Sequence, residues 1–165
     1  MKENKTSEEL IYDYTNKSEL TNTERKDFFY HLTLLDWNNM AKDYGESFND
    51  KILKKIMNEK IEDLETMSNA ILLYNNPYGI YTLEFGKLIT KFYLKDKIKF
   101  IKALNLVKDE TINIVYVFRL ERIFPDDYTE DDSAEIQASN MLTDEEKETA
   151  RMFFKMYRNI CISCL

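Results

Sequence analysis

Apolar residues recur close to the helical repeat over two stretches in the first half of the chain. The first stretch carries Phe28, Leu32, Leu35, Met40 and Tyr44. The second stretch carries Leu53, Met57, Ile61, Leu64, Met67 and Ile71. This spacing places each set on one side of a helix. Gly45 can end the first helix and the turn residues of 75–79 can end the second, so the sequence predicts an antiparallel helical hairpin.

Helix starts are marked by a hydroxyl residue that is followed three positions later by an acid. In this arrangement the hydroxyl accepts a backbone N–H of the first turn, and the acid accepts the N–H of the capping residue. The four pairs are Thr6 with Glu9, Thr21 with Glu24, Ser47 with Asp50, and Thr143 with Glu146. They predict a helix within residues 1–20, the two helices of the hairpin and a last helix over 144–160.

A different period is found at 112–123, where apolar and polar residues alternate. The apolar set is Ile112, Ile114, Tyr116, Phe118 and Leu120, and the polar set is Asn113, Arg119 and Glu121. Such alternation in a run rich in β-branched residues predicts a strand. A strand needs partners, and the candidates are 81–85 and 98–104. The charges of 84–95 fall on one helical face, so the sequence leaves open whether this segment is a helix.

These elements together predict an α+β fold with an N-terminal helical hairpin, a small antiparallel sheet and a C-terminal helix. The 165 residues have the length of one domain, and 44% of them are hydrophobic, which is enough for a single core. We therefore expect one globular domain over 1–165. Within it, we expect a loosely ordered helix in 1–20 and an acidic connector at 124–141.

Composition bears on location and origin. The first 20 residues contain no apolar run of signal-peptide length, and no stretch of about 18 residues is apolar enough to span a bilayer. We therefore expect a cytoplasmic protein without membrane contact. The wealth of Lys, Asn, Ile and Tyr, with only 3 Gly and 2 Pro, is typical of AT-rich coding. This points to a low-GC bacterium, its phage or another virus, and we expect a phage or mobile element to encode the protein.

Catalytic and metal-binding residues are few. Cys161 and Cys164 have the spacing of zinc ligands, but a structural zinc site needs four ligands and the only histidine, His31, is distant in sequence. His31 is also the only base that a histidine-dependent triad could use. The acids near Asp126 do not fit a calcium loop, and a metal-dependent enzyme built on them is a third and weaker reading. We expect no cofactor, no metal and no enzymatic activity.

The most unusual segment of the chain is acidic. Residues 124–139 contain six carboxylates and no basic residue. The six are Asp126, Asp127, Glu130, Asp131, Asp132 and Glu135. A charge run of this kind is often only a solvated connector. A dense row of carboxylates can also resemble phosphates and dock on a basic surface, where it accelerates association and loses strength with salt.

A lysine-rich segment precedes the acidic one. Between 87 and 108 there are seven lysines and one acid, interleaved with Phe92, Tyr93 and Phe100. Six of these lysines are candidate contacts to nucleic acid, namely Lys87, Lys91, Lys95, Lys97, Lys99 and Lys102. Lysines bind phosphates and aromatic rings stack on bases. The net charge of -7 opposes such binding, and the same lysines could simply face solvent.

These features indicate a small acidic binding protein. Its partner would be a protein with a basic, nucleic-acid-binding surface, and its role would be that of an inhibitor or adaptor of a host nucleic-acid enzyme. Anti-CRISPR and antirestriction proteins are examples of this functional type. The alternative is a nucleic-acid-binding regulator that uses 87–102. The sequence leaves open whether the protein is a monomer or a homodimer.

Overall fold

The chain is helical throughout the part that the structure describes. The structure is a computed structural model, and it describes residues 4–160. It contains ten α-helices, and none of the described residues lies in a β-strand. The predicted α+β fold with its antiparallel sheet is therefore wrong, and the fold is all-α.

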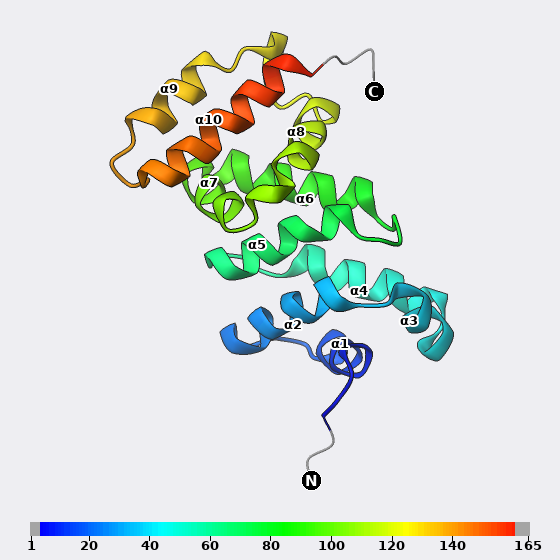
Figure 1. Cartoon of the computed structure of the whole chain (residues 1–165). Coiled ribbons are helices and arrows are strands. Elements are labelled where there is room, and N and C mark those ends of the chain that lie inside the picture. Colours follow the sequence, from blue (N-terminus) through cyan, green and yellow to red (C-terminus); the bar gives the residue numbers. More distant parts are fainter. Residues whose placement is uncertain (1–3, 161–165) are drawn as a thin grey trace. The chain divides into compact units, whose positions relative to one another are not determined.

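The helices form two compact units, Met1–Tyr81 and Thr82–Leu165 (Figure 1). The first unit holds α1 (Ser7–Asn16), α2 (Asn22–Leu34), α3 (Trp37–Tyr44), α4 (Glu46–Asn58), α5 (Leu64–Leu72) and the 3-10 turn η1 (Leu73–Asn75). The second unit holds α6 (Thr82–Lys95), α7 (Lys97–Leu106), η2 (Lys108–Glu110), α8 (Thr111–Leu120), η3 (Pro125–Asp127), α9 (Glu130–Ala138) and α10 (Asp144–Asn159). The single domain expected for 1–165 stays a prediction.

Three of the four predicted helix starts are confirmed. Thr6, Thr21 and Thr143 cap α1, α2 and α10, and in each case the acid three residues later completes a capping box. The fourth start is wrong, because α4 begins at Glu46 directly after Gly45 and Ser47 lies inside the helix. The last helix agrees closely with the predicted 144–160.

The two long helices of the predicted hairpin are each divided in two. Asp36 interrupts the first, because its carboxylate accepts the N–H groups of Asn38 and Asn39 at 2.9 Å and so starts α3. Asp63 interrupts the second in the same way, accepting the Thr66 N–H at 2.9 Å. A side-chain acceptor at these positions competes with the continuing helix and favours a new start.

The core of the first unit is built where α1 packs on α2, α2 on α5, and α3 on α4. Its fully buried side chains are Ile11, Phe28, Phe29, Met40, Ile52, Ile56 and Ile71. They include members of the apolar stripes that the sequence pattern picked out, so the periodicity located the core even where it missed the helix breaks.

Residues 112–123 form no strand, because 111–120 are the helix α8. The buried residues follow helical spacing, as Ile114, Val115, Val117 and Phe118 show. In contrast, Leu120, which a strand would have buried beside Phe118, is 63% exposed. The β-branched run suggested a strand, but packing on several sides selects a helix.

The two candidate partner strands are also helical. Residues 98–104 lie within α7, and 81–85 lead into α6, which begins at Thr82. The helical alternative for 84–95 is therefore the correct one. Asp96 separates the two helices and accepts the N–H of Lys99 at 3.0 Å.

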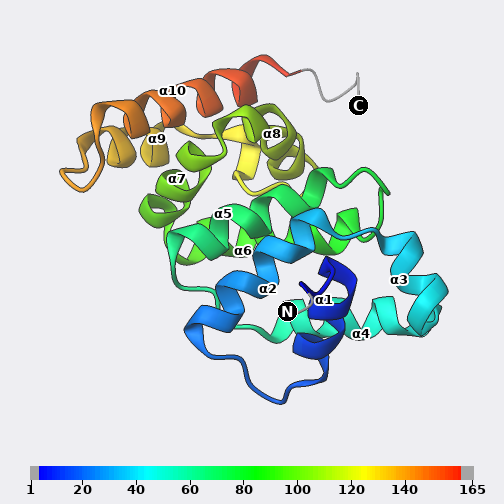
Figure 2. The ribbon, with the colours of Figure 1, turned by 60° about the horizontal axis from the view of Figure 1, so that its bottom comes forward.

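An aromatic cluster fills the core of the second unit. Its rings belong to Tyr93, Phe100, Phe118, Phe124, Phe153, Phe154 and Tyr157. Around it, α10 packs against α7, α8 and α9, and α6 packs against α7 and α8 (Figure 2). This arrangement brings the acidic segment next to helices that lie 30 to 40 residues away in sequence.

Candidate functional site

The acidic segment folds into η3 and α9, and three of its six carboxylates pair with a lysine or an arginine. Asp127 accepts from Arg119 Nη1 at 2.9 Å and from the Tyr157 hydroxyl at 3.0 Å. These contacts fix η3 against α8 and α10. The buried guanidinium balances the charge of Asp127, so this carboxylate is not available as a free charge.

The other two paired acids lie on α9 and contact α6 and α7. Asp132 accepts the hydroxyl of buried Tyr93 at 2.5 Å and lies 3.4 Å from Lys97 Nζ. Glu135 pairs with the same Nζ at 2.5 Å. Burial and the bond to Asp132 raise the pKa of Tyr93, which keeps its hydroxyl a donor over the physiological range. These bonds hold α9 in one orientation.

Apolar side chains anchor the same segment. Ile136 of α9 is fully buried, Phe124 lies in the aromatic cluster, and Thr129 is 1% exposed. Burial of a large side chain is worth about 1.5–3 kcal/mol, which exceeds the typical value of an exposed ion pair, about 0–1 kcal/mol. Packing therefore supplies most of the anchoring, and the acidic segment is an ordered element rather than a bare connector.

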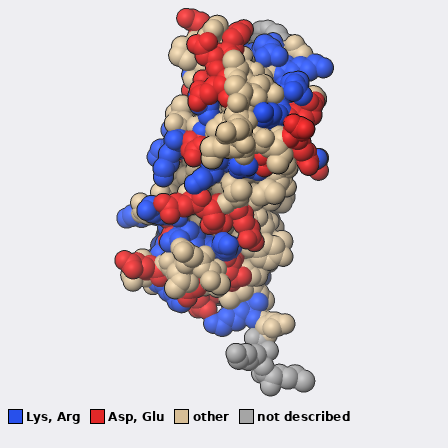
Figure 3. All heavy atoms as spheres, turned by 90° about the vertical axis from the view of Figure 1, so that its left-hand side faces the viewer, with Lys and Arg blue, Asp and Glu red and all other residues tan. Residues whose placement is uncertain are grey.

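Three carboxylates of the segment point to solvent. Asp126, Glu130 and Asp131 are exposed, and no lysine or arginine of residues 4–160 lies within 4 Å of them. Asp131 accepts the Tyr128 hydroxyl at 3.1 Å, and Glu130 accepts the backbone N–H of Thr129 at 3.0 Å. We call these three residues the acidic row. Carboxylates and basic side chains adjoin on the face seen in Figure 3, so it is not uniformly acidic.

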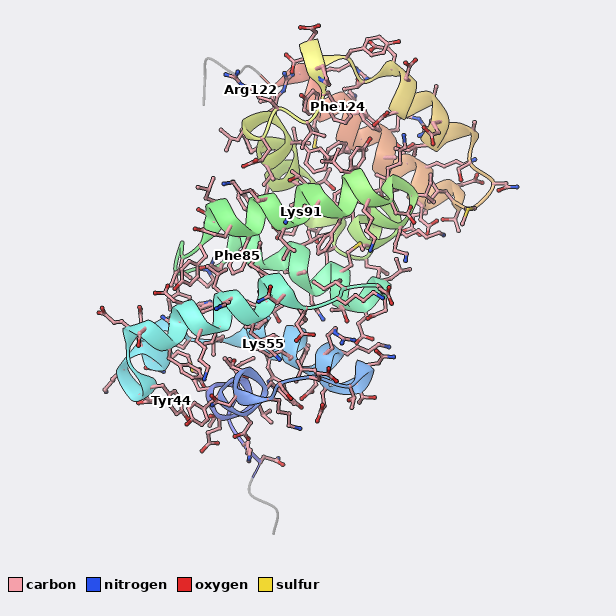
Figure 4. The ribbon with its side chains drawn as sticks, turned by 180° about the vertical axis from the view of Figure 1, so that it is seen from behind. Tyr44, Lys55, Phe85, Lys91, Arg122 and Phe124 are labelled. Carbon is pink, nitrogen blue, oxygen red and sulfur yellow. The ribbon has the colours of Figure 1, made fainter. Side chains whose placement is uncertain are left out.

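The lysine-rich segment likewise contains lysines that pair with acids and exposed lysines that do not pair within the described chain. Lys97 pairs with α9, and Lys102 lies 3.0 Å from Glu146 of α10. Lys87, Lys91 and Lys95 recur every four residues on the exposed side of α6 and have no acidic partner within 4 Å in the described chain (Figure 4 labels Lys91). Lys99 at the start of α7 is likewise without such a partner.

The aromatic residues expected to stack on bases are not available. Phe92 is 8% exposed, Tyr93 3% and Phe100 0%. Their rings belong to the core of the second unit. The segment can therefore offer lysines to phosphates, but the stacking proposed for these three rings is wrong.

His31 lies close to two polar side chains, one of which is far from it in sequence. Its Nδ1 lies 2.9 Å from Ser7 Oγ, and its Nε2 lies 3.5 Å from Asp27 Oδ1. The residue types are those of a nucleophilic triad. However, Asp27 also accepts the Tyr14 hydroxyl at 2.6 Å. The open hollow beside it is lined by Tyr14, Thr23, Tyr30 and four charged residues, and Ser7 is not among them. The contacts are explained by the attachment of α1 to α2.

No group of three or more metal-ligating side chains occurs in residues 4–160. Cys161 and Cys164 lie outside the described residues, so the expectation that they hold no metal stays a prediction. None of the helices within the described range has the length and apolar character needed to cross a bilayer. Comparison of the chain with models of protein families, with curated proteins and with solved structures gives no match.

Sequence reasoning missed Arg119, Arg122 and Tyr157. Arg119 was placed on the polar face of a strand, but its side chain is only 6% exposed. Its guanidinium lies 4.0 Å from the centre of the Tyr157 ring and donates to the Tyr157 carbonyl oxygen. The one sequence signal was an arginine inside a strongly apolar run, a place where a charged residue needs a partner.

Proposed function

We propose that the protein is a cytoplasmic inhibitor or adaptor that uses the acidic row to bind a basic, nucleic-acid-binding surface of a partner protein. The observation that carries this proposal is the division of the six acids. Asp127, Asp132 and Glu135 pair with basic side chains and hold the segment in place, while Asp126, Glu130 and Asp131 are exposed and have no basic partner within 4 Å in the described chain. A preformed row of charges binds without the entropic cost of ordering a loop.

The exposure of the acidic row sets how much it can contribute to partner binding. Exposed charges contribute mainly to the rate of encounter, because they attract the partner before the contact surfaces meet. Each exposed ion pair adds only about 0–1 kcal/mol to affinity. The acidic row should therefore select and guide the partner, and the phage or mobile-element origin inferred from composition makes a host nucleic-acid enzyme the expected target.

The first prediction concerns α9. The double variant Glu130→Gln, Asp131→Asn should bind the partner roughly three- to tenfold more slowly at low salt, with a nearly unchanged dissociation rate. A pull-down from a low-GC bacterial lysate supplies the partner, and surface plasmon resonance measures both rates. The association rate of the unmodified protein should fall as salt is added, since salt screens exposed charges.

A matched control separates the acidic row from net charge. Glu19→Gln, Asp43→Asn removes two exposed carboxylates of the first unit that also lack a basic partner within 4 Å in the described chain. It changes the net charge by the same amount. If both double variants slow association equally, the overall field is responsible and the acidic row is not the docking surface.

A second candidate function is nucleic-acid binding by α6. The observation that favours it is a row of exposed lysines without an acidic partner within 4 Å in residues 4–160, namely Lys87, Lys91 and Lys95. Three lysines can neutralise few phosphates, and the overall charge of -7 repels the backbone. The burial of the neighbouring rings leaves no stacking contribution from them.

We therefore expect no appreciable affinity for duplex DNA or single-stranded RNA at physiological salt. Fluorescence anisotropy with a labelled 20-mer of each kind tests this. A dissociation constant in the micromolar range with a steep salt dependence, abolished by Lys87→Gln, Lys91→Gln, Lys95→Gln, would transfer the function to α6. Lys42→Gln, Lys54→Gln, Lys155→Gln provides a control of equal charge change at exposed lysines elsewhere.

A further inference from the structure

The C-terminal end of α8 contains an arginine where the backbone favours glycine. The N–H of Ile123 donates to the Phe118 carbonyl at 3.2 Å, and the N–H of Arg122 donates to the Arg119 carbonyl at 3.3 Å. This pair of bonds defines a Schellman turn, whose left-handed position is usually glycine. Arg122 occupies that position with φ of 50°, a conformation that is unfavourable for residues with a Cβ.

Nothing within the described chain explains the choice of arginine. The Arg122 side chain is exposed and forms no hydrogen bond, ion pair or ring contact with residues 4–160 (Figure 4). Its only structural effect is thus the strain of the turn. Positions where a sequence breaks a local rule without a compensating contact are those where function is expected.

Arg122 lines a pocket of about 330 Å³ in the second unit. The lining residues are Arg119, Arg122, Phe124, Pro125, Asp126 and Asp127. Asp126 and Asp127 are also left-handed, with φ of 53° and 57°. Aspartate tolerates this region better than most residues, yet three left-handed residues within six positions mark an unusual backbone around one pocket.

The inner wall of the pocket is a buried guanidinium. Arg119 lies over the ring of Tyr157 and is paired with Asp127 at 2.9 Å. Its Nε is buried and has no hydrogen-bond partner among the described residues. An unsatisfied buried donor is unfavourable, so Arg119 retains hydrogen-bonding capacity that the fold does not use.

The charges of the pocket add up to zero. Asp127 balances Arg119, but Arg122 and Asp126 lie more than 4 Å from any opposite charge in the described chain, including each other. A simple anion can satisfy only Arg122 and a simple cation only Asp126. A ligand that carries both charges can satisfy both free side chains.

We propose that this pocket binds a small zwitterion of the amino-acid type. The ligand carboxylate contacts Arg122 and the ligand ammonium contacts Asp126, while the paired Arg119 and Asp127 form the wall behind them. Bidentate binding of a carboxylate by a guanidinium accounts for an arginine at this strained position. This site is separate from the docking role of Glu130 and Asp131, although Asp126 belongs to both surfaces.

Isothermal titration calorimetry on the full chain tests the proposal with glycine, β-alanine and γ-aminobutyrate, which differ in the separation of their charges. At least one of the three should bind saturably, while acetate and methylammonium at equal concentration should not. Arg122→Gly and Asp126→Asn should each weaken that binding by about tenfold or more. Lys155→Ala, at an exposed lysine of α10, should leave it unchanged.

Arg122→Gly is informative because it should also raise the melting temperature, since glycine relieves the left-handed strain. Loss of binding in a more stable variant cannot come from unfolding. The proposal is overturned if none of the three zwitterions binds, if acetate binds as well as the best of them, or if Arg122→Gly binds normally. None of these results bears on docking, which is tested with Glu130 and Asp131 alone.

Discussion

Replacing Phe118 with alanine should lower the free energy of unfolding by about 3–5 kcal/mol, the usual range for a fully buried phenylalanine. Phe118 is 0% exposed, and its ring centre lies 5.0 to 5.4 Å from those of Tyr93, Phe100 and Phe153. The loss combines lost apolar burial with a cavity that these rings cannot fill. Urea unfolding followed by far-UV circular dichroism measures it, because the single tryptophan, Trp37, lies in the first unit.

Two neighbouring variants test the helix as well as the core. In a strand, Leu120 would share the buried face with Phe118, and Val117 would point the other way. In α8, Leu120 is 63% exposed and Val117 is 1% exposed. Leu120→Ala should therefore change stability by no more than about 0.5 kcal/mol, and Val117→Ala should cost more. The reverse order would contradict the helical assignment of 111–120.

Sequence signals that involve only neighbouring residues predicted three helix starts correctly. The capping boxes at Thr6, Thr21 and Thr143 involve residues only three positions apart. Such bonds form largely independently of the rest of the chain, so they can be recognised from sequence. Ser47 failed because Gly45 provides an earlier start, with φ of 93° that few other residues could adopt.

The predicted sheet rested on the strand preference of β-branched side chains, which tertiary packing overrode. Residues 112–117 include several β-branched side chains, which favour strands when one face is buried. In the folded chain, α8 contacts α6 and α10, so apolar residues are needed on more than one side. Alternation of polarity over ten residues cannot distinguish this case from a half-buried strand.

Composition located the candidate site. It did not show which acids pair with basic side chains and which stay exposed to solvent. All six acids of 126–135 looked equivalent in sequence. Asp127 and Asp132 became structural because Arg119, Tyr157 and Tyr93 approach them from 8 to 39 positions away. Such contacts depend on tertiary packing, which the charge pattern does not contain. The acidic row is what remains after these two acids and Glu135, which pairs with Lys97, are set aside.

Alkaline pH should destabilise the protein through its buried tyrosines. Burial, followed by the hydrogen bond to Asp127, raises the pKa of Tyr157 from 10.0 to about 12. The folded state therefore holds the phenolic proton that the unfolded chain releases near pH 10. The stability that this proton contributes is fully present below pH 10 and is lost as pH rises through about 12. Between those values the free energy of unfolding should fall by about 1.4 kcal/mol per pH unit for this group.

Tyr157→Phe should remove that part of the pH dependence. Phenylalanine keeps the ring over Arg119 but has no proton to lose, so the decline in stability between pH 10 and 12 should be shallower by about 2–3 kcal/mol in total. Urea unfolding at half-unit steps of pH measures the slope. Tyr30→Phe, at a tyrosine that is 51% exposed, controls for the loss of a hydroxyl. Because Tyr157 is fully buried and donates to Asp127, an equal change of slope in both variants would mean that the buried phenol is not the source. A shallower slope in Tyr157→Phe alone would show that ionisation of the buried Tyr157 phenol causes this part of the loss of stability.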